Sequence, residues 1–238
     1  MRNPIIAALD VPSAEAALAL ARELAPAVGG LKIGSELFTA AGPGIVNKIR
    51  ETGAAVFLDL KFHDIPNTVS RAVAAATRLD VQMLTVHAGG GMAMLKAAER
   101  SARDTAQSLG RAAPLVLGVT VLTSMDGPAL GEVGLQADAG SQVERLATLA
   151  VQGGLRGLVC SPREIAGLRK LIPREMQLVV PGIRDGTSPP DDQKRTMAAA
   201  EAMAAGADWL VIGRPICAAK SPRAAAEQIL AALAADAR

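Results

Sequence analysis

The sequence repeats one local pattern along most of its length: a short apolar run rich in β-branched residues, then an alanine-rich stretch with helical spacing. Apolar runs without polar alternation are typical of strands in a parallel sheet that is covered on both faces. The chain of 238 residues contains eight such runs. The predicted strands are Ile5–Val11, Gly30–Gly34, Ala54–Lys61, Val81–His87, Pro114–Val121, Gly157–Ser161, Gln177–Ile183 and Trp209–Ile216.

The stretches between these runs predict helices and, with the strands, a closed barrel. Eight strands, most of them followed by a helix, over this length are typical of the α/β fold called the (β/α)8 or TIM barrel, and we expect a single domain over residues 1–238. An open doubly wound sheet is the alternative, although no Gly-x-Gly-x-x-Gly follows the first run. The predicted helices are Ala14–Leu24, Asn67–Arg78, Met92–Gln107, Ser141–Gln152, Arg163–Leu171, Asp192–Ala205 and Pro222–Ala234.

Composition narrows the possible partners and the location. A formal net charge of +2 and an aromatic content of 2% provide neither a basic surface nor stacking rings, so we expect no nucleic-acid partner. No stretch reaches the roughly 18 apolar residues of a membrane-spanning helix, and no apolar signal region precedes the first strand. We therefore expect a cytoplasmic protein without membrane contact. Cys160 and Cys217 lack metal-ligand spacing and are interpreted as reduced core residues, and His63 and His87 are given no role in the chemistry.

Charged residues concentrate where the predicted strands end. Asp59 and Lys61 are two residues apart at the end of the third run, so strand periodicity directs both side chains to one face, and Asp64 follows in the loop. Asp10 lies near the end of the first run and Lys32 lies in the second. The carboxyl ends of barrel strands meet at one mouth, where barrel enzymes carry out their chemistry. Two aspartates and two lysines are therefore expected to meet near one point.

This charge cluster is either a structural ion pair or an active site, because burying unpaired charges costs on the order of several kcal/mol per ion. A structural pair needs no second lysine and no third aspartate at the same mouth, so we favour an active site. An ammonium group of Lys61 held there is a proton donor directed at developing negative charge. For Lys32 the alternative is a side chain that extends to solvent, and for Asp10 it is a helix cap, although Ser13 is the better cap.

The loops after the seventh and eighth runs predict a phosphate site. Such loops in barrels commonly bind phosphate through close backbone approach at glycines and the N-terminus of a short helix. Arg184 comes two residues after Gly182 in one loop and Arg214 directly follows Gly213 in the other, and a guanidinium group matches phosphate oxygens. A solvated arginine is the alternative for each. The polar stretch 185–193 has the length of a lid, which would bring Gln193 onto the ligand.

The run Asp59-Leu60-Lys61-Phe62-His63-Asp64-Ile65-Pro66-Asn67-Thr68 resembles the signature of the orotidine 5′-phosphate decarboxylase family, bacterial type. A bare Asp-x-Lys-x-x-Asp is shared with barrel enzymes that act on sugar phosphates, whereas the extended pattern is specific. The resemblance continues, in the family's order, in Ala8-Leu9-Asp10, Leu31-Lys32-Ile33-Gly34, Thr120-Val121-Leu122-Thr123-Ser124, Pro181-Gly182-Ile183-Arg184 and Ile212-Gly213-Arg214-Pro215-Ile216.

The resemblance implies a homodimer that needs no cofactor and no metal, with composite active sites at the dimer interface. It implies decarboxylation of orotidine 5′-phosphate (OMP) to uridine 5′-phosphate (UMP) and CO2 in pyrimidine biosynthesis. In such a site Lys61 would be the proton donor, and Lys32, Asp59 and Asp64 would complete its charge network. Asp59 would lie near the departing carboxylate, and Asp64 would reach into the partner subunit's site.

The resemblance also implies how the substrate is held. Asp10 and Lys32 would bind the ribose hydroxyls, Thr68 would contribute from across the interface, and Thr123 would contact the pyrimidine. The phosphate would be held by Arg184, Gln193, Gly213 and Arg214.

Two other hypotheses stay open. A sugar-phosphate decarboxylase, aldolase or epimerase on the same barrel would use the carboxylates to hold Mg²⁺ against an enediolate. Thr123, Gln193 and the Ile-Pro-Asn-Thr segment after Asp64 favour the nucleotide instead. A barrel that binds a nucleotide without catalysis is the other hypothesis, and the presence of Lys61 argues against it.

Overall fold

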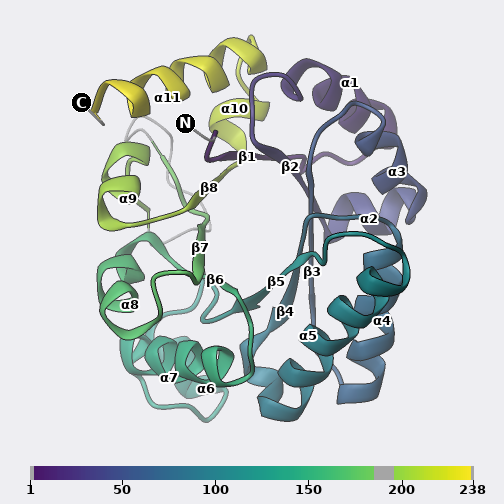
Figure 1. Cartoon of the computed structure of the whole chain (residues 1–238). Coiled ribbons are helices and arrows are strands. Elements are labelled where there is room, and N and C mark those ends of the chain that lie inside the picture. Colours follow the sequence, from purple (N-terminus) through teal and green to yellow (C-terminus); the bar gives the residue numbers. More distant parts are fainter. Residues whose placement is uncertain (1–2, 185–195, 237–238) are drawn as a thin grey trace.

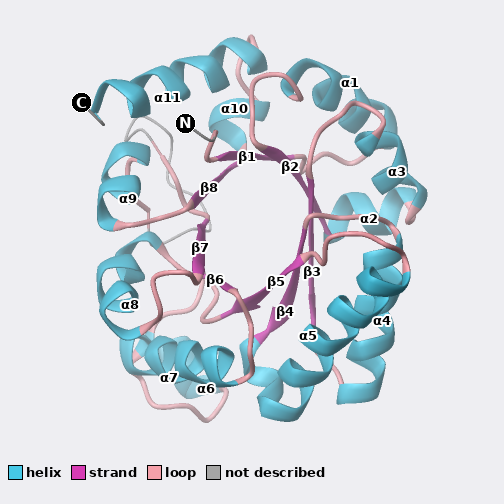
Figure 2. Ribbon diagram, in the orientation of Figure 1, coloured by secondary structure: helices cyan, strands magenta, loops and turns pink. Residues whose placement is uncertain are grey.

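The computed structural model describes residues 3–184 and 196–236, which form a closed barrel of parallel strands inside a ring of helices (Figures 1 and 2). Each strand pairs with its neighbours in sequence, and β8 pairs with β1 to close the sheet. The predicted (β/α)8 barrel is thus confirmed. The strands are β1 (Ile5–Ala8), β2 (Gly30–Gly34), β3 (Val56–Phe62), β4 (Met83–His87), β5 (Leu115–Val119), β6 (Gly157–Val159), β7 (Gln177–Val180) and β8 (Trp209–Ile212).

Helices cover the outer face of the sheet on all sides (Figure 2). In the described parts of the chain they are α1 (Ala14–Leu24), α2 (Ser35–Ala41), α3 (Gly44–Arg50), α4 (Pro66–Arg78), α5 (Gly91–Ser108), α6 (Gly127–Glu132), α7 (Ala139–Gln152), α8 (Ile165–Leu171), α9 (Ala199–Ala205), α10 (Arg214–Cys217) and α11 (Pro222–Asp236). Two short 3-10 segments, Ala88–Gly90 and Pro162–Glu164, precede α5 and α8.

Strand alternation divides the buried side chains into two clusters. In β1, Ile5 and Ala7 pack outward in the large cluster shared with the helices, whereas Ile6 and Ala8 belong to a smaller cluster inside the barrel. Trp209 begins β8 in this inner cluster, and its indole Nε1 donates to Gln177 Oε1 at 2.8 Å. The inner cluster contains Ile6, Ala8, Phe57, Met83, Leu117, Val179, Trp209 and Val211.

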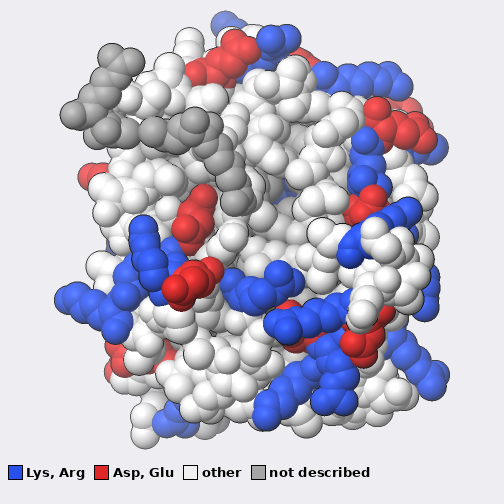
Figure 3. Space-filling model, viewed as in Figure 1, with Lys and Arg blue, Asp and Glu red and all other residues white. Residues whose placement is uncertain are grey.

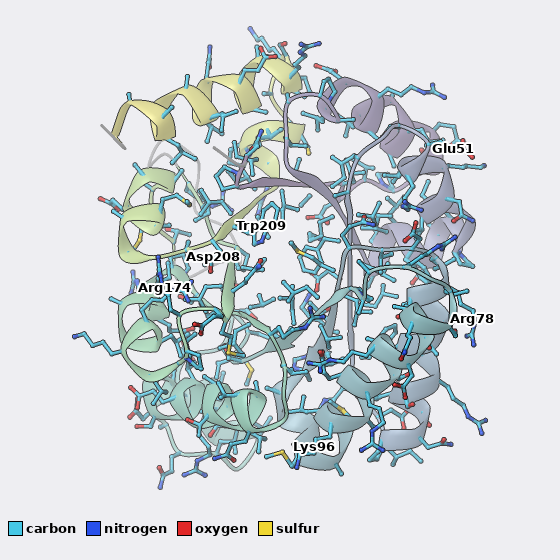
Figure 4. The ribbon with its side chains drawn as sticks, viewed as in Figure 1. Glu51, Arg78, Lys96, Arg174, Asp208 and Trp209 are labelled. Atoms are coloured by element: carbon cyan, nitrogen blue, oxygen red, sulfur yellow. The ribbon has the colours of Figure 1, made fainter. Side chains whose placement is uncertain are left out.

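Charged side chains lie mostly on the helical ring. Figure 4 places Arg78, Lys96 and Arg174 on the outside and Trp209 within the ring of strands. Acidic and basic groups are interspersed on the face shown in Figure 3, and the central part of that face is largely uncharged. Within residues 3–184 and 196–236, no helix has both the length and the apolar sequence that crossing a membrane requires.

The strand ends differ from the prediction at the barrel mouth. The predicted run Trp209–Ile216 is wrong beyond Ile212, because the backbone turns at Gly213 (φ −99°, ψ −103°) and Arg214–Cys217 form α10. β7 likewise ends at Val180, and Gly182 follows with a φ of +81°, which glycine adopts at no steric cost. The structure also has four helices that we did not predict, namely α2, α3, α6 and α10.

The predicted helix Asp192–Ala205 is only partly observed. In its described part α9 begins at Ala199, and residues 192–195 lie outside the described residues. The other predicted helices are present with ends shifted by a few residues at most.

Candidate active site

The carboxyl ends of the strands surround a cavity of about 900 Å³, and eight of the predicted site residues line it. It opens at the mouth of the barrel, between the loops that follow β1, β5, β7 and β8. Apolar residues of the strands, among them Phe57, Val159 and Val211, form its floor and walls. The predicted residues in the lining are Asp10, Lys32, Asp59, Lys61, Thr123, Arg184, Gly213 and Arg214.

Four of these side chains form a continuous row of alternating charge. Lys32 Nζ lies 2.8 Å from Asp10 Oδ1 and 3.9 Å from Asp59 Oδ2. Lys61 Nζ is 2.9 Å from Asp59 Oδ2 and 3.0 Å from Asp59 Oδ1, so this ammonium group spans both carboxylate oxygens. Each aspartate in the row is thus neutralised by a lysine. The structure therefore brings together charged side chains from the ends of three strands, as predicted.

The backbone at Lys61 departs from a regular strand. The register between β3 and β4 shifts between Leu58 and Phe62, and Lys61 has a φ of +51°, in the left-handed region that non-glycine residues rarely adopt. Its amide N–H donates to Thr85 Oγ1 at 2.8 Å, and the same oxygen donates to Asp59 Oδ1 at 3.0 Å. Sequence reasoning missed Thr85, although its position two residues before His87 in the predicted fourth strand is a signal that it faces the barrel interior.

Gly34 is a second residue that sequence reasoning did not assign. A Cβ at this position would lie 3.0 Å from Lys32 Nζ and 3.3 Å from Asp10 Oδ1, closer than such contacts normally are. The absence of a side chain at Gly34 therefore leaves room for the ion pair between Lys32 and Asp10.

The predicted phosphate loops lie side by side at the mouth. Beyond Gly182, the backbone at Ile183 bridges to Met197, and Arg184 N donates to Met197 O at 2.9 Å. Arg214 begins α10 immediately after Gly213, and both arginines contribute to the lining of the cavity. Gln193, which we predicted to come from the same region, lies outside the described residues.

Two predicted residues do not join the cavity within one chain. Asp64 and Thr68 are exposed and lie in the segment that leads from β3 into α4. Asp64 Oδ1 accepts a hydrogen bond from the amide of Ile65, whose side chain is 67% exposed. The prediction that Asp64 and Thr68 act in a partner's site stays a prediction.

The two histidines lie together beside the charge row. The ring centroids of His63 and His87 are 5.3 Å apart. Burial lowers the pKa of His87 below its usual value, and the nearby His63 and Lys61 lower it further, while Asp59 acts in the opposite direction. His87 therefore favours its neutral form.

The two cysteines line the cavity rather than lying remote from it. Cys160 is buried, and the Cys217 thiol donates to Ala8 O at 3.1 Å. Burial, with a smaller contribution from Asp10, raises the pKa of Cys217 to about 11. The Cys217 thiol is therefore protonated and a poor nucleophile at neutral pH. Among the described residues, no three His, Cys, Asp or Glu side chains are grouped as ligands for a metal ion.

Comparison with known proteins identifies the family. The family model described as orotidine 5′-phosphate decarboxylase / HUMPS matches residues 3–229. The chain belongs to this family. A curated orotidine 5′-phosphate decarboxylase from Moorella thermoacetica is 51% identical over 231 residues, covering 97% of this chain and 92% of that protein. The corresponding protein from Dichelobacter nodosus is 50% identical and covers 97% of this chain and 99% of its own.

A solved structure of a family member supports the same assignment. The crystal structure of orotidine 5′-phosphate decarboxylase from Lactobacillus acidophilus superposes with a TM-score of 0.87 at 35% identity, covering 97% of this chain and 99% of that one. The match extends over nearly the whole chain, so the fold of this chain is that of a solved member of the family.

Proposed function

We propose that this chain decarboxylates OMP to UMP and CO2 with Lys61 as the proton donor. The activity follows from membership of the orotidine 5′-phosphate decarboxylase family and from relatives of that name at about 50% identity over nearly the whole chain. The role of Lys61 rests on one observation: the alternating row of Asp10, Lys32, Asp59 and Lys61 at the mouth of a cavity that two arginines also line.

The chemistry of the reaction requires a fixed cation. Loss of CO2 from C6 of the pyrimidine leaves a lone pair in the plane of the ring, where it cannot delocalise into the π system. Stabilisation must then come from a positive group already in place beside C6, since a preorganised charge needs no rearrangement as the reaction proceeds. The Lys61 ammonium, held by both oxygens of Asp59, has this property and carries the proton that C6 needs.

The remaining lining residues would hold the substrate. Asp10 and Lys32 suit the ribose hydroxyls, because one accepts and the other donates hydrogen bonds. Thr123, on the loop after β5, would contact the pyrimidine. On the opposite side of the mouth the phosphate would be bound by Arg184, Gly213 and Arg214, with Gln193 joining them from beyond the described residues.

The site is completed, in our proposal, by a second copy of the chain. Asp64 and Thr68 are exposed here beside the largely exposed Ile65, which is an arrangement suited to a surface that another subunit covers. Asp64 and Thr68 of one subunit would then enter the site of the other. We place the reaction in the cytoplasm, where phosphorylated nucleotide precursors are made.

The rival activity is a Mg²⁺-dependent reaction of a sugar phosphate on the same barrel. It would need carboxylates free to coordinate the metal. Asp10 and Asp59 instead make their closest contacts with lysine ammonium groups, at 2.8 and 2.9 Å. The pairing of both carboxylates with lysines favours a reaction in which the lysine ammonium groups, rather than a metal ion, contact the substrate.

The deciding experiment is an assay of OMP decarboxylation after exhaustive treatment with a chelator. We expect full release of CO2 from OMP, and no turnover of hexulose or pentulose phosphates with or without Mg²⁺. Loss of OMP turnover on metal removal would sink the proposal. Binding of UMP without any turnover of OMP would favour the non-catalytic nucleotide-binding barrel.

A further inference from the structure

Thr85 is a fully buried polar residue beside the charge row, and neither the family signature nor the roles above include it. It lies in β4 two residues after Met83, so its side chain points to the inside of the barrel like that of Met83. Its hydroxyl makes two contacts, to the amide of Lys61 at 2.8 Å and to the carboxylate of Asp59 at 3.0 Å.

The chemistry of the three groups fixes the direction of both hydrogen bonds. A hydroxyl has one proton to donate and lone pairs to accept with, an ionised carboxylate only accepts, and an amide N–H only donates. The Thr85 hydroxyl must therefore give its proton to Asp59 and accept from Lys61. The side chain of a valine or an alanine at this position could make neither hydrogen bond.

The bulge in β3 explains why a hydroxyl is needed. The register shift between Leu58 and Phe62 takes Lys61 out of regular pairing with β4, and its φ of +51° is a conformation that the surroundings must hold in place. Thr85 supplies the acceptor that the Lys61 amide needs. The same hydroxyl supplies a donor to Asp59, whose other bonds in this row go to Lys61 and Lys32.

We propose that Thr85 is a positioning residue for the proton donor: its hydroxyl holds the backbone of Lys61 and the carboxylate that orients the Lys61 ammonium at the same time. The proposal rests on the proposed function, because it explains how the group that protonates C6 is held. It predicts that loss of the Thr85 hydroxyl lowers the rate of decarboxylation more than it weakens ligand binding. A small displacement of a reacting group lowers the rate of the chemical step much more than it weakens ground-state binding.

The test compares Thr85→Val, which keeps the shape and removes the hydroxyl, with Thr85→Ser, which keeps the hydroxyl. We expect Thr85→Val to lower the single-turnover rate of OMP decarboxylation about 30-fold or more and to change the Kd for UMP by less than about threefold. Thr85→Ser should stay within about threefold of the wild type in both quantities. Single turnover is measured so that product release does not hide the chemical step.

Thr77→Val is the matched control, because it also removes a buried threonine hydroxyl, one that donates to Val73 O at 2.8 Å within α4, away from the cavity. It should lose stability but keep its rate. If Thr85→Val does not fold, Thr85→Cys replaces it, since a thiol is a weak donor and acceptor of similar size.

Three outcomes would overturn the proposal: a rate within about threefold of the wild type for Thr85→Val, equal losses in the valine and serine variants, or a loss of UMP affinity as large as the loss of rate. Failure of the proposed function is recognised separately, because the wild type would then not turn over OMP at all. In that case hydrogen exchange of the Lys61 amide still decides whether Thr85 holds it. We expect faster exchange in Thr85→Val than in Thr85→Ser, and equal rates would contradict the proposal.

Discussion

At the scale of single residues, Asp59 and Lys61 form one ion pair whose two members differ in exposure. The Asp59 side chain is 13% exposed and the Lys61 side chain 36%, so the carboxylate lies deeper and the ammonium nearer to the cavity. An ammonium held from behind by both oxygens of a carboxylate has little freedom to turn away. Lys61 is thus preorganised to meet a ligand in the cavity.

Replacing Lys61 with alanine should abolish the chemical step and leave the binding of UMP largely intact. In the proposed mechanism the variant would lose both the cation beside C6 and the proton that C6 receives, and we expect kcat to fall by roughly 10⁴-fold or more. The measurements are CO2 release from OMP and UMP affinity by calorimetry. Lys96→Ala, an exposed lysine of α5, is the control. A Lys61→Ala variant with a tenth of wild-type activity would refute the role of proton donor.

Replacing Arg214 with alanine should act mainly on the phosphate. A charge-assisted contact of this kind contributes about 1.5–3 kcal/mol, so kcat/KM for OMP should fall roughly 10- to 150-fold. Affinity for uridine, which has no phosphate, should change little. Arg174→Ala, an exposed arginine of the outer ring (Figure 4), should leave both values unchanged. An equal loss of affinity for uridine and UMP would show that Arg214 does not serve the phosphate.

At the scale of secondary-structure elements, the adjacent ends of β3 and β4 bring two histidines together and make stability depend on pH. The pKa of His87 is lowered in the folded protein, so below about pH 6.5 the unfolded chain takes up a proton that the folded protein does not. Stability from this group is therefore fully present above the unfolded pKa and is lost as the pH falls below it. We expect the free energy of unfolding, measured in urea, to decline less steeply between pH 7 and pH 5 in His87→Gln than in the wild type. Identical slopes would contradict this assignment.

The pattern of elements was predictable from the sequence because barrel strands are apolar on both faces and their helices have a clear period. The mouth was less predictable. Apolar runs continue past the ends of β1, β5, β7 and β8 into loops that line the cavity, so the pattern overstates strand length there. The bulge at Lys61 leaves no mark in the periodicity, because Asp59 and Lys61 have the spacing of a regular strand. The role of Thr85 was missed for the same reason, because its hydroxyl accepts from the Lys61 amide only when the bulge is present.

The amino ends of β7 and β8 are tied to α8 by one arginine. Arg169 donates to Met176 O at 2.7 Å and to Gly206 O at 2.8 Å, and it pairs with Asp208, which also accepts from Leu178 N. Arg169→Met keeps the apolar stem and leaves these acceptors unpaired, so we expect about 2–4 kcal/mol of destabilisation in urea unfolding.

Activity distinguishes this structural role from a role in catalysis. Arg169 lies at the end of the barrel opposite the mouth, so kcat and KM of the folded variant should equal those of the wild type. Arg223→Met, which breaks only the exposed pair with Glu227, should have no measurable effect on stability. A change in KM for Arg169→Met without a change in stability would contradict this assignment.

At the scale of the whole molecule, closure of the barrel brings residues that are distant in the sequence together in one site. Asp10 follows β1, Lys32 and Asp59 lie in β2 and β3, and Arg214 begins α10 after β8. They meet because parallel strands all end at the same mouth. The charged part of the site could therefore be predicted once the barrel was inferred. Asp64 could not be placed in the same way, because a single chain does not contain the surface that it would contact.

A mixing experiment decides whether Asp64 serves the neighbouring site. Lys61→Ala and Asp64→Ala variants, each of which we expect to be nearly inactive, are unfolded together and refolded. If Asp64 acts across the interface, each mixed dimer has one site that lacks both groups and one that is intact. Random assembly makes half of the dimers mixed, so about a quarter of wild-type activity should return. If Asp64 acts within its own chain, neither site of the mixed dimer is complete and no activity returns. Lys61→Ala mixed with Asp59→Ala is the matched control, because both residues belong to one chain's charge row and no recovery is expected.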